Sequence, residues 1–415
     1  MSAVAAVRGQ LGGFTRILGI RDYRLLWSAQ LVSTFGDRLT QVALTALVFS
    51  MTGSDASIGL LLTLTMLPKA AFGLFAGALG DRVSRKSLLV TTDYVRGVIV
   101  LVLALAGGLP LSTVYLLAAL HATATVFFTP TRYAVLPDIV PEDQLLAANT
   151  LDETTQSSLD PVAFLIGGLL VGAVGFRIGF GVDAATFAVS AGLITLTTAR
   201  GAARWRARRG SGAAGGPVAG GIGLWSGLHA IWNDRVLRAN TLLVVGAAAV
   251  ASAETPLSAM LVLTHWRRGA MGLGIFEAAL AVGFVLGAVL CAPVIDRVGK
   301  GPSILLGLIG TGVCIAALAA LPFWPAVAVM AVSGVFNILF FAPSITIMQE
   351  RAPSAVRARV LCARTALTAI AVVVSYAGAT VLTARFAPQM VMFALGLVLA
   401  LGTAAVSRVP DLRRP

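Results

Sequence analysis

Charged residues are scarce in this sequence. Of its 415 residues only 12% are charged, while 57% are hydrophobic. In a typical soluble domain about a quarter of the residues are charged, because the surface faces water. A surface that faces lipid must instead stay apolar, since lipid offers no partners for polar groups. The composition therefore excludes an ordinary soluble enzyme and predicts an integral membrane protein.

Cysteine is also rare, and the usual catalytic motifs are missing. Cys291, Cys314 and Cys362 lie far apart inside apolar segments, without the spacing of a disulfide framework or a metal site. The sequence contains no H-E-x-x-H, G-x-S-x-G or phosphate-binding loop. We therefore expect no catalytic residues, no metal and no cofactor, and we do not expect ATP to be the direct energy source.

Long apolar segments, by contrast, fill most of the chain. Each can supply the roughly 20 helical residues that cross a hydrocarbon layer of about 30 Å. Short breaks such as Pro322-Phe323-Trp324-Pro325 separate neighbouring segments. The sequence predicts an all-α membrane protein with twelve transmembrane helices. The expected spans are 24–49, 57–80, 87–107, 111–134, 145–174, 178–199, 236–263, 270–294, 302–321, 324–347, 358–384 and 388–407.

The basic residues predict the orientation. The net charge is +13, and most of the cations lie in alternate connections between spans, as the positive-inside rule requires for cytoplasmic loops. We expect both termini in the cytoplasm of a cell that carries the protein in its inner or plasma membrane. The basic start leads into a long apolar run without a cleavage site, so we expect it to be retained. Nucleic acid is not an expected partner.

The longest connection divides the chain into two sets of six spans. We expect an amino-terminal half at 1–199, a basic cytoplasmic linker at 200–235 and a carboxy-terminal half at 236–415. The arginine-rich start of the linker and its Gly/Ala tract are typical of a flexible segment beside anionic lipid. Residues 224–232 form an amphipathic pattern, which predicts a helix lying in the membrane interface.

The two halves repeat short motifs in equivalent places. Gly77 to Lys86 follows the second span, and the similar run Val294 to Lys300 follows the eighth. Phe127-Phe128-Thr129-Pro130 in the fourth span corresponds to Phe340-Phe341-Ala342-Pro343 in the tenth. Paired halves of this kind are typical of transporters whose site lies between the halves near the middle of the bilayer.

Along nearly its whole length the chain resembles the major facilitator superfamily of transporters. Gly77 to Lys86 is similar to that family's loop motif G-x-L-x-D-R-x-G-R-R, with Ser84 in place of a glycine. Further segments resemble the twelve-span drug and siderophore exporters of the enterobactin and macrolide efflux type. These segments include Tyr23-Arg24-Leu25-Leu26-Trp27, Asp93-Tyr94-Val95-Arg96 and Leu136-Pro137-Asp138. The exporter motif of the fifth span is present only loosely, as Asp160-Pro161 and Gly167-Gly168.

The resemblance implies a conformational latch on the cytoplasmic side, which holds the halves together when the cavity faces outward. Its acids can accept hydrogen bonds at a helix amino terminus, and its cations can pair with acids on facing helices. The alternative is that these charges only mark topology, although that alternative does not explain the aspartates. Asp93 and Arg96, three residues apart, are expected to neutralise each other and support the latch. The latch residues are Gly77, Asp81, Arg82, Arg85, Lys86, Asp93, Arg96, Asp296 and Arg297.

Acids inside the membrane are the candidates for proton coupling or substrate binding, because an ionisable group there is costly and usually functional. They are Asp37, Glu254, Asp160 and Glu277. The alternative for each is a permanently paired structural acid, and for Asp183 that packing role is preferred. Arg38 should point about 100° away from Asp37, so Asp37 is expected to lack a permanent ionic partner.

Helical spacing predicts which residues line the central path, which the resemblance assigns to spans one, four, seven and ten. In spans one, four and ten, polar and aromatic residues recur at intervals of three and four. His121 could relay protons or simply hold two helices together. The predicted lining residues are Gln30, Thr34, Gln41, His121, Thr125, Phe128, Arg132, Asn337 and Phe341.

These patterns favour a secondary transporter, most of all a proton-coupled exporter of amphipathic drugs, antibiotics or siderophores that works by alternating access. A metabolite importer or facilitator on the same fold is the alternative. A membrane scaffold, a receptor or a membrane-embedded enzyme is a third reading. We expect a monomer whose partners are the bilayer, protons and a small-molecule substrate, with the proton gradient as its energy source.

Overall fold

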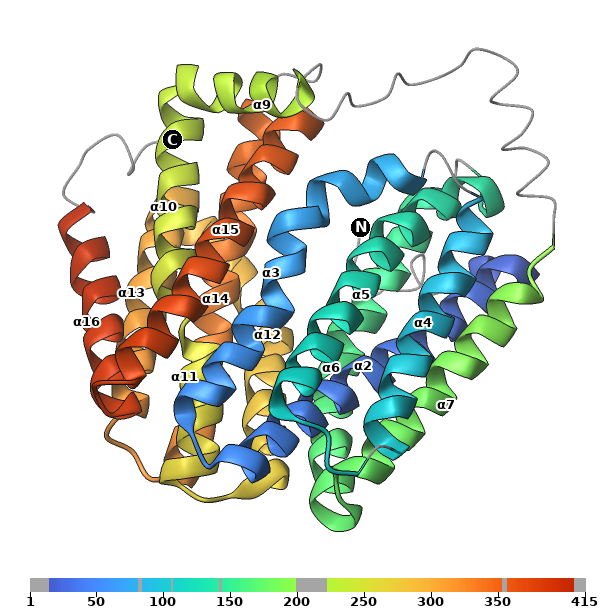
Figure 1. Ribbon diagram of the computed structural model, residues 1–415. Helices are drawn as coiled ribbons and strands as arrows, with labels where there is room; N and C mark the ends of the chain where they lie inside the picture. Colours follow the sequence, from blue (N-terminus) through green and yellow to red (C-terminus); the bar gives the residue numbers. More distant parts are fainter. Residues whose placement is uncertain are drawn as a thin grey trace.

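A computed structural model describes residues 15–80, 84–105, 107–141, 144–198, 222–352 and 357–406. Over these residues the chain is built of helices joined by short turns, and it contains no β-strand (Figure 1). Ten helical segments of the described chain are long and apolar enough to cross a membrane. The all-α membrane fold is therefore confirmed, while the count of twelve stays a prediction.

The two expected spans outside that set are the first and the fifth. Helix α2 (Arg21–Thr52) is long enough but carries several charged residues. Helix α6 (Leu145–Val174) is polar in its first half, and its apolar part, Leu159–Val174, is shorter than a full span. The other helices of the first half are α3 (Asp55–Gly80), α4 (Arg85–Leu105), α5 (Leu111–Ile139) and α7 (Phe176–Thr195).

The segment 199–221, which includes most of the predicted linker, lies outside the described residues. The remaining helices follow it. Their bounds agree closely with the predicted spans, and α14 begins directly after Pro322, at the predicted hairpin. They are α9 (Ile222–Asn233), α10 (Arg235–Ala251), α11 (Glu254–Met260), α12 (Gly269–Val298), α13 (Lys300–Leu318), α14 (Phe323–Arg351), α15 (Arg357–Thr383) and α16 (Pro388–Val406).

The seventh span differs from the prediction of one continuous helix over 236–263. Helix α10 stops at Ala251, α11 starts at Glu254, and a π-helical turn (Leu261–His265) completes the span. Pro256 lacks the amide hydrogen that a continuous helix needs, so the ladder is interrupted just before it. As a result, Glu254 lies at a break in the interior of the span.

Helix α9 matches the amphipathic helix predicted for 224–232. It crosses the end of the bundle above α10 and α15 (Figure 1). Ile231 is fully buried against Met348, Ala352 and Val360, while Trp232 on the same helix is 54% exposed. One face of α9 therefore packs on the protein. Its placement at a membrane interface remains a prediction.

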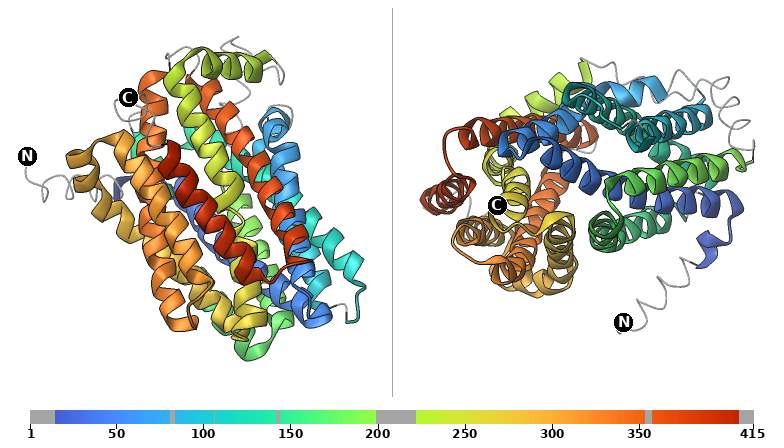
Figure 2. Two further views of the ribbon diagram at one scale, coloured as in Figure 1. Left: turned by 90° about the vertical axis from the view of Figure 1, so that its left-hand side faces the viewer. Right: turned by 60° about the horizontal axis from the view of Figure 1, so that its bottom comes forward.

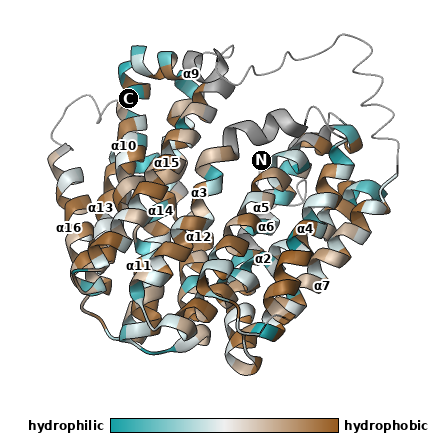
Figure 3. Ribbon diagram, viewed as in Figure 1, coloured by the Kyte–Doolittle hydropathy of each residue, from teal (hydrophilic) through white to brown (hydrophobic). Residues whose placement is uncertain are grey.

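Helices α2–α7 and helices α10–α16 form two groups that pack against each other. Seen from the end, the blue-to-green helices lie on one side and the yellow-to-red helices on the other (Figure 2). Hydrophobic residues dominate the bodies of the helices (Figure 3). The groups meet mainly where α6 packs on α12 and α3 packs on α15.

Glycine permits the closest approach between the two groups. A Cβ atom at Gly168 of α6 would lie 2.7 Å from the Cα atom of Gly274 on α12 and 2.8 Å from the carbonyl oxygen of Ala270. These backbone atoms cannot move aside as a flexible side chain can. Near the same end of the bundle, Gly59 of α3 packs against Thr380 of α15. The two groups are therefore closed at the end opposite α9, and their ribbons diverge toward α9 (Figure 1).

Candidate functional site

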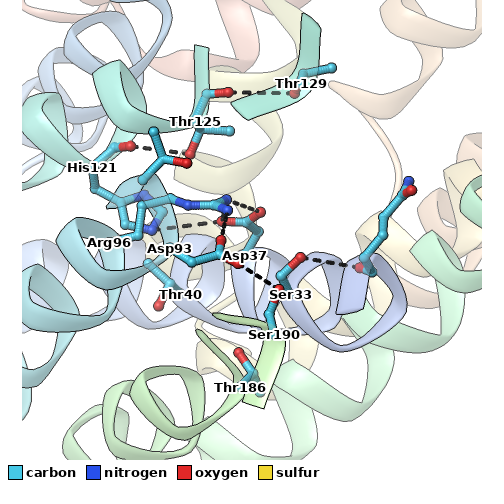
Figure 4. A network of polar contacts seen from close by, with 12 residues as sticks. Ser33, Asp37, Thr40, Asp93, Arg96, His121, Thr125, Thr129, Thr186 and Ser190 are labelled. Atoms are coloured by element: carbon cyan, nitrogen blue, oxygen red, sulfur yellow. Dashed lines mark hydrogen bonds and ion pairs between the residues drawn. The ribbon is translucent and has the colours of Figure 1, made fainter. Parts of the chain in front are cut away.

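Asp37 lies in a buried ion-pair network inside the first group of helices (Figure 4). Its carboxylate is 3.2 Å from Nη1 of Arg96 on α4. Nη2 of the same arginine pairs with Asp93, which also accepts a 2.6 Å hydrogen bond from Ser190 on α7. The predicted Asp93–Arg96 pair is therefore present. The prediction that Asp37 has no ionic partner is wrong, because Arg96 reaches it from a helix that the sequence spacing could not place.

Two aromatic rings enclose the arginine of this network. The Arg96 guanidinium lies 4.4 Å from the ring centroids of both Phe128 and Phe187. Cation–π contacts of this kind are stronger when water is excluded. The side chains of Arg96 and Asp93 are 1% and 0% exposed, whereas that of Asp37 is 25% exposed. Asp37 is thus the member of the network that water and protons can reach.

His121 lies beside the Asp37 carboxylate. Its Nε2 atom is 3.6 Å from Oδ1 of Asp37 and has no hydrogen-bond partner within the described chain. The ring also packs 5.7 Å from Phe187. A shift of well under 1 Å would bring the two atoms within hydrogen-bond distance. The arrangement can therefore pass a proton between a carboxylate and an imidazole.

Asp183 holds α7 against α2, as the packing role predicted. It accepts hydrogen bonds from Thr40 at 2.5 Å and from Thr186 at 2.8 Å, and it is fully buried. A Cβ atom at Gly36 would collide with this carboxylate. The glycine before Asp37 is therefore needed so that α7 can approach α2 at the level of the network.

Arg38 points away from Asp37 and pairs with another predicted acid. Its guanidinium donates two hydrogen bonds to the Asp160 carboxylate, at 2.8 and 3.0 Å, and stacks 5.2 Å from the Phe164 ring. Asp160 is therefore a paired acid. The predicted angle of about 100° between neighbouring side chains correctly separated Arg38 from Asp37, but it could not reveal that α6 supplies the partner.

A small pocket lies between the two groups of helices, at their closed end. Gln41, Thr45 and Phe164 line it from the first group, and Thr255, Leu273 and Glu277 line it from the second. Of the predicted lining residues, Gln41 is the one that borders this pocket.

The two glutamates of the second group form no ion pair within the described chain. Glu254 and Glu277 are close enough to repel each other electrostatically, and Arg38 is close enough to attract Glu277. Oε1 of Glu254 is buried without a hydrogen-bond partner in the part of the chain that the structure describes. Lys69, an exposed cation inside α3 that the sequence analysis overlooked, lies within electrostatic reach of Arg38.

Gln30 and Arg132, two predicted lining residues, are buried and bind each other. Arg132 donates to Gln30 and, at 2.5 Å, to Asp152 on α6, which also accepts a 2.9 Å hydrogen bond from Tyr23. Arg132 is only 3% exposed. These side chains join α2, α5 and α6 and do not face an open path in this conformation. The sequence analysis did not single out Asp152, although it lies within the predicted span 145–174.

The other predicted lining residues differ in exposure. Phe128 is buried beneath Arg96, and Phe341 is 43% exposed. Thr34, Thr125 and Asn337 are half-buried.

The predicted latch is described only in part, since Asp81 and Arg82 lie outside the described residues. Gly77 lies in the last turn of α3. Arg85 pairs with Asp138 at 2.9 Å, and Lys86 donates to the carbonyl oxygens of Thr195 and Thr197 at 2.8 Å. These contacts tie α4 to α5 and α7 within one group. Asp296 and Arg297 are exposed at the end of α12.

Comparison with known proteins identifies the family to which this chain belongs. The model of the Major Facilitator Superfamily matches residues 26–376. The chain therefore belongs to the Major Facilitator Superfamily, a family of membrane transporters, and it is a multi-pass membrane protein.

Two exporters are among its relatives. The enterobactin exporter EntS of Escherichia coli O1:K1 / APEC is 25% identical over 350 residues, which cover 81% of this chain and 79% of that protein. Macrolide efflux protein A of Streptococcus pyogenes is 30% identical over 135 residues. That second match covers 32% of this chain and only 33% of the relative.

Solved structures share the fold at low identity. A POT family peptide transporter has a TM-score of 0.71 and 14% identity, with 95% of this chain and 97% of that chain covered. A bacterial homologue of the iron transporter ferroportin, in its inward-facing state, has a TM-score of 0.70 and 13% identity. That match covers 95% of this chain and 99% of the other. These likenesses extend the agreement in fold to the whole bundle.

Proposed function

We propose that this transporter is a proton-coupled exporter of amphipathic small molecules that works by alternating access. The observation that carries the proposal is the Asp37 carboxylate, shared between buried Arg96 and the unpartnered Nε2 of His121. A carboxylate in this setting can gain and lose a proton without leaving Arg96 unpaired, because Asp93 stays bound to it. Two relatives are named as exporters, which supports the direction of transport.

The proposed cycle follows from the way the halves meet. In this conformation they touch at the end opposite α9, which we assign to the outside of the cell. A proton that enters from the outside binds Asp37 and weakens its attraction to Arg96. When the cavity opens inward, substrate arrives and the proton leaves. The closed outer contact around Gly168 and the inward-facing state of the ferroportin homologue fit this assignment. No cofactor is needed, and we expect a monomer.

We also propose that both termini and the 200–235 linker are cytoplasmic. The support is the excess of cations in those parts of the sequence. In a variant without Cys291, Cys314 and Cys362, a single cysteine at Ser211 should resist an impermeant thiol reagent added to intact cells. It should react when the same reagent is added to inside-out vesicles. Labelling in intact cells would reverse the assigned orientation.

The direction of transport and its energy source can be tested in inside-out membrane vesicles that contain the protein. We expect at least one member of a panel of radiolabelled macrolides, catecholate siderophores and lipophilic drugs to accumulate when the lumen is acidic. A protonophore should abolish this accumulation, and vesicles without the protein serve as the control. Uptake that equilibrates without a gradient would instead favour a facilitator. Gradient-driven uptake seen only in right-side-out vesicles would favour a metabolite importer.

A further inference from the structure

The second group of helices contains a buried arginine that the network around Asp37 does not use. Arg364 of α15 is 6% exposed and donates a 2.9 Å hydrogen bond to Oγ of Ser344 on α14. Its guanidinium also lies 5.8 Å from the ring centroid of Phe341. Within the described residues no carboxylate forms an ion pair with it. Arginine carries five N–H donors, and within the described residues a hydrogen bond is found for one nitrogen of Arg364, Nη1.

The internal repeat shows what is unusual about this arginine. Phe341 occupies the place in the tenth span that Phe128 occupies in the fourth, and each ring faces an arginine. The arginine over Phe128 is Arg96, which is neutralised by Asp93 and Asp37. Among the described residues, the arginine over Phe341 has no such acid. A buried cation without a counter-ion is costly, so a site that keeps one is suited to receive an anion.

A second unpartnered group lies at the same place. Asn240 of α10 is 4% exposed and donates a 2.9 Å hydrogen bond to the carbonyl oxygen of Ser344. Its own side-chain oxygen is buried without a partner in the described chain. Buried polar atoms are nearly always hydrogen-bonded, so this oxygen indicates a missing donor such as a hydroxyl group or water. Three helices therefore bring an unneutralised cation and a free acceptor to one spot.

We propose that Arg364, Ser344 and Phe341 form a binding site for the anionic end of an amphipathic substrate, and that the Asn240 oxygen accepts a hydrogen bond from a hydroxyl group of that substrate or from water. Arg364 and Ser344 would bind a carboxylate, sulfonate or phenolate by charge-assisted hydrogen bonds. Phe341 is 43% exposed, so its ring can hold the apolar body beside that group. The inference rests on the proposed transport function, and it narrows the substrate class to molecules that carry a negative charge.

The test is equilibrium dialysis of the purified full-length protein in detergent, with three probes of one ring system and different charge. They are 2-naphthoate, 2-naphthalenemethanol and 2-naphthylmethylamine, which are anionic, neutral and cationic at pH 7.5. We expect the wild-type protein to bind 2-naphthoate about tenfold more tightly than the other two, as one charge-assisted contact allows. Arg364→Gln should remove this preference. Arg364→Lys should keep part of it, because lysine retains the positive charge but lacks the planar guanidinium group that donates two parallel hydrogen bonds.

Arg385→Gln is the matched control, since Arg385 is an exposed cation in the turn between α15 and α16. It should bind all three probes as the wild type does. Equal binding of the three probes by the wild type, or an undiminished preference in Arg364→Gln, would refute the site. Binding is measured without a gradient. A protein that prefers the anion but shows no proton-driven transport would therefore refute the proposed function and leave this site standing.

Discussion

Asp37→Asn is expected to reduce proton-driven accumulation in inside-out vesicles to the background of vesicles without the protein. The amide copies the protonated acid and can no longer release a proton when substrate arrives. Arg96 keeps Asp93 as its counter-ion, so the variant should still fold and insert. Asp37→Glu should retain part of the activity, because the carboxyl group survives in a shifted position. Substrate-induced pH change in weakly buffered, purified protein provides a second measurement.

Glu350→Gln is the control for this experiment, because Glu350 pairs with Lys300 at an exposed position outside the network. It should transport like the wild type. Glu254→Gln should resemble Asp37→Asn if both halves share the proton. Full gradient-driven uptake and full proton release by the Asp37→Asn, Glu254→Gln double variant would rule out both acids. Glu277 would then become the leading candidate, since Asp160 is already paired with Arg38.

Arg96→Leu should destabilise the protein by about 3–5 kcal/mol, because it leaves Asp93 as a buried charge without its partner. Asp93 is 0% exposed and retains only the hydrogen bond from Ser190. The loss also removes the contacts with Phe128 and Phe187. Thermal unfolding in detergent, followed as the fraction that remains monodisperse on size exclusion, measures the effect.

A double variant separates the lost ion pair from lost packing. Arg96→Leu combined with Asp93→Asn leaves no buried charge at this place and should melt at a higher temperature than Arg96→Leu alone. If the two side chains did not interact, the losses of stability caused by the two substitutions would add up in the double variant. A single variant that melts like the wild type, or a double variant with additive loss, would show that the pair contributes little to stability.

The helices themselves were largely predictable, because an apolar segment in lipid must satisfy its backbone internally. The prediction of 145–174 matches α6, and Pro322 of the predicted hairpin is the residue directly before α14. The break before Glu254 was missed. A pattern of apolar residues continues across such an interruption, although Pro256 provided a signal.

The candidate site was predictable only as a set of residues. The interior position of Asp37, Asp160, Glu254 and Glu277 could be inferred from the sequence, since charge inside an apolar run is conspicuous whatever surrounds it. The ion-pair partners of these acids could not be inferred in the same way. Asp37 and Arg96 lie 59 residues apart, and Arg38 and Asp160 lie 122 apart. No periodicity within one helix indicates which side chains of another helix face it.

The amino-acid sequence by itself thus determined the membrane class, the helical fold and the interior acids, because these depend on local composition and on the cost of exposing polar groups to lipid. Only the tertiary structure decided which of those acids are neutralised. Helix packing pairs Asp37 with Arg96, which it shares with Asp93, and pairs Asp160 with Arg38. Glu254 and Arg364 receive no partner of opposite charge among the described residues. Pairing depends on distances of a few ångströms between helices, and those distances are set by the close contacts at residues such as Gly36 and Gly168.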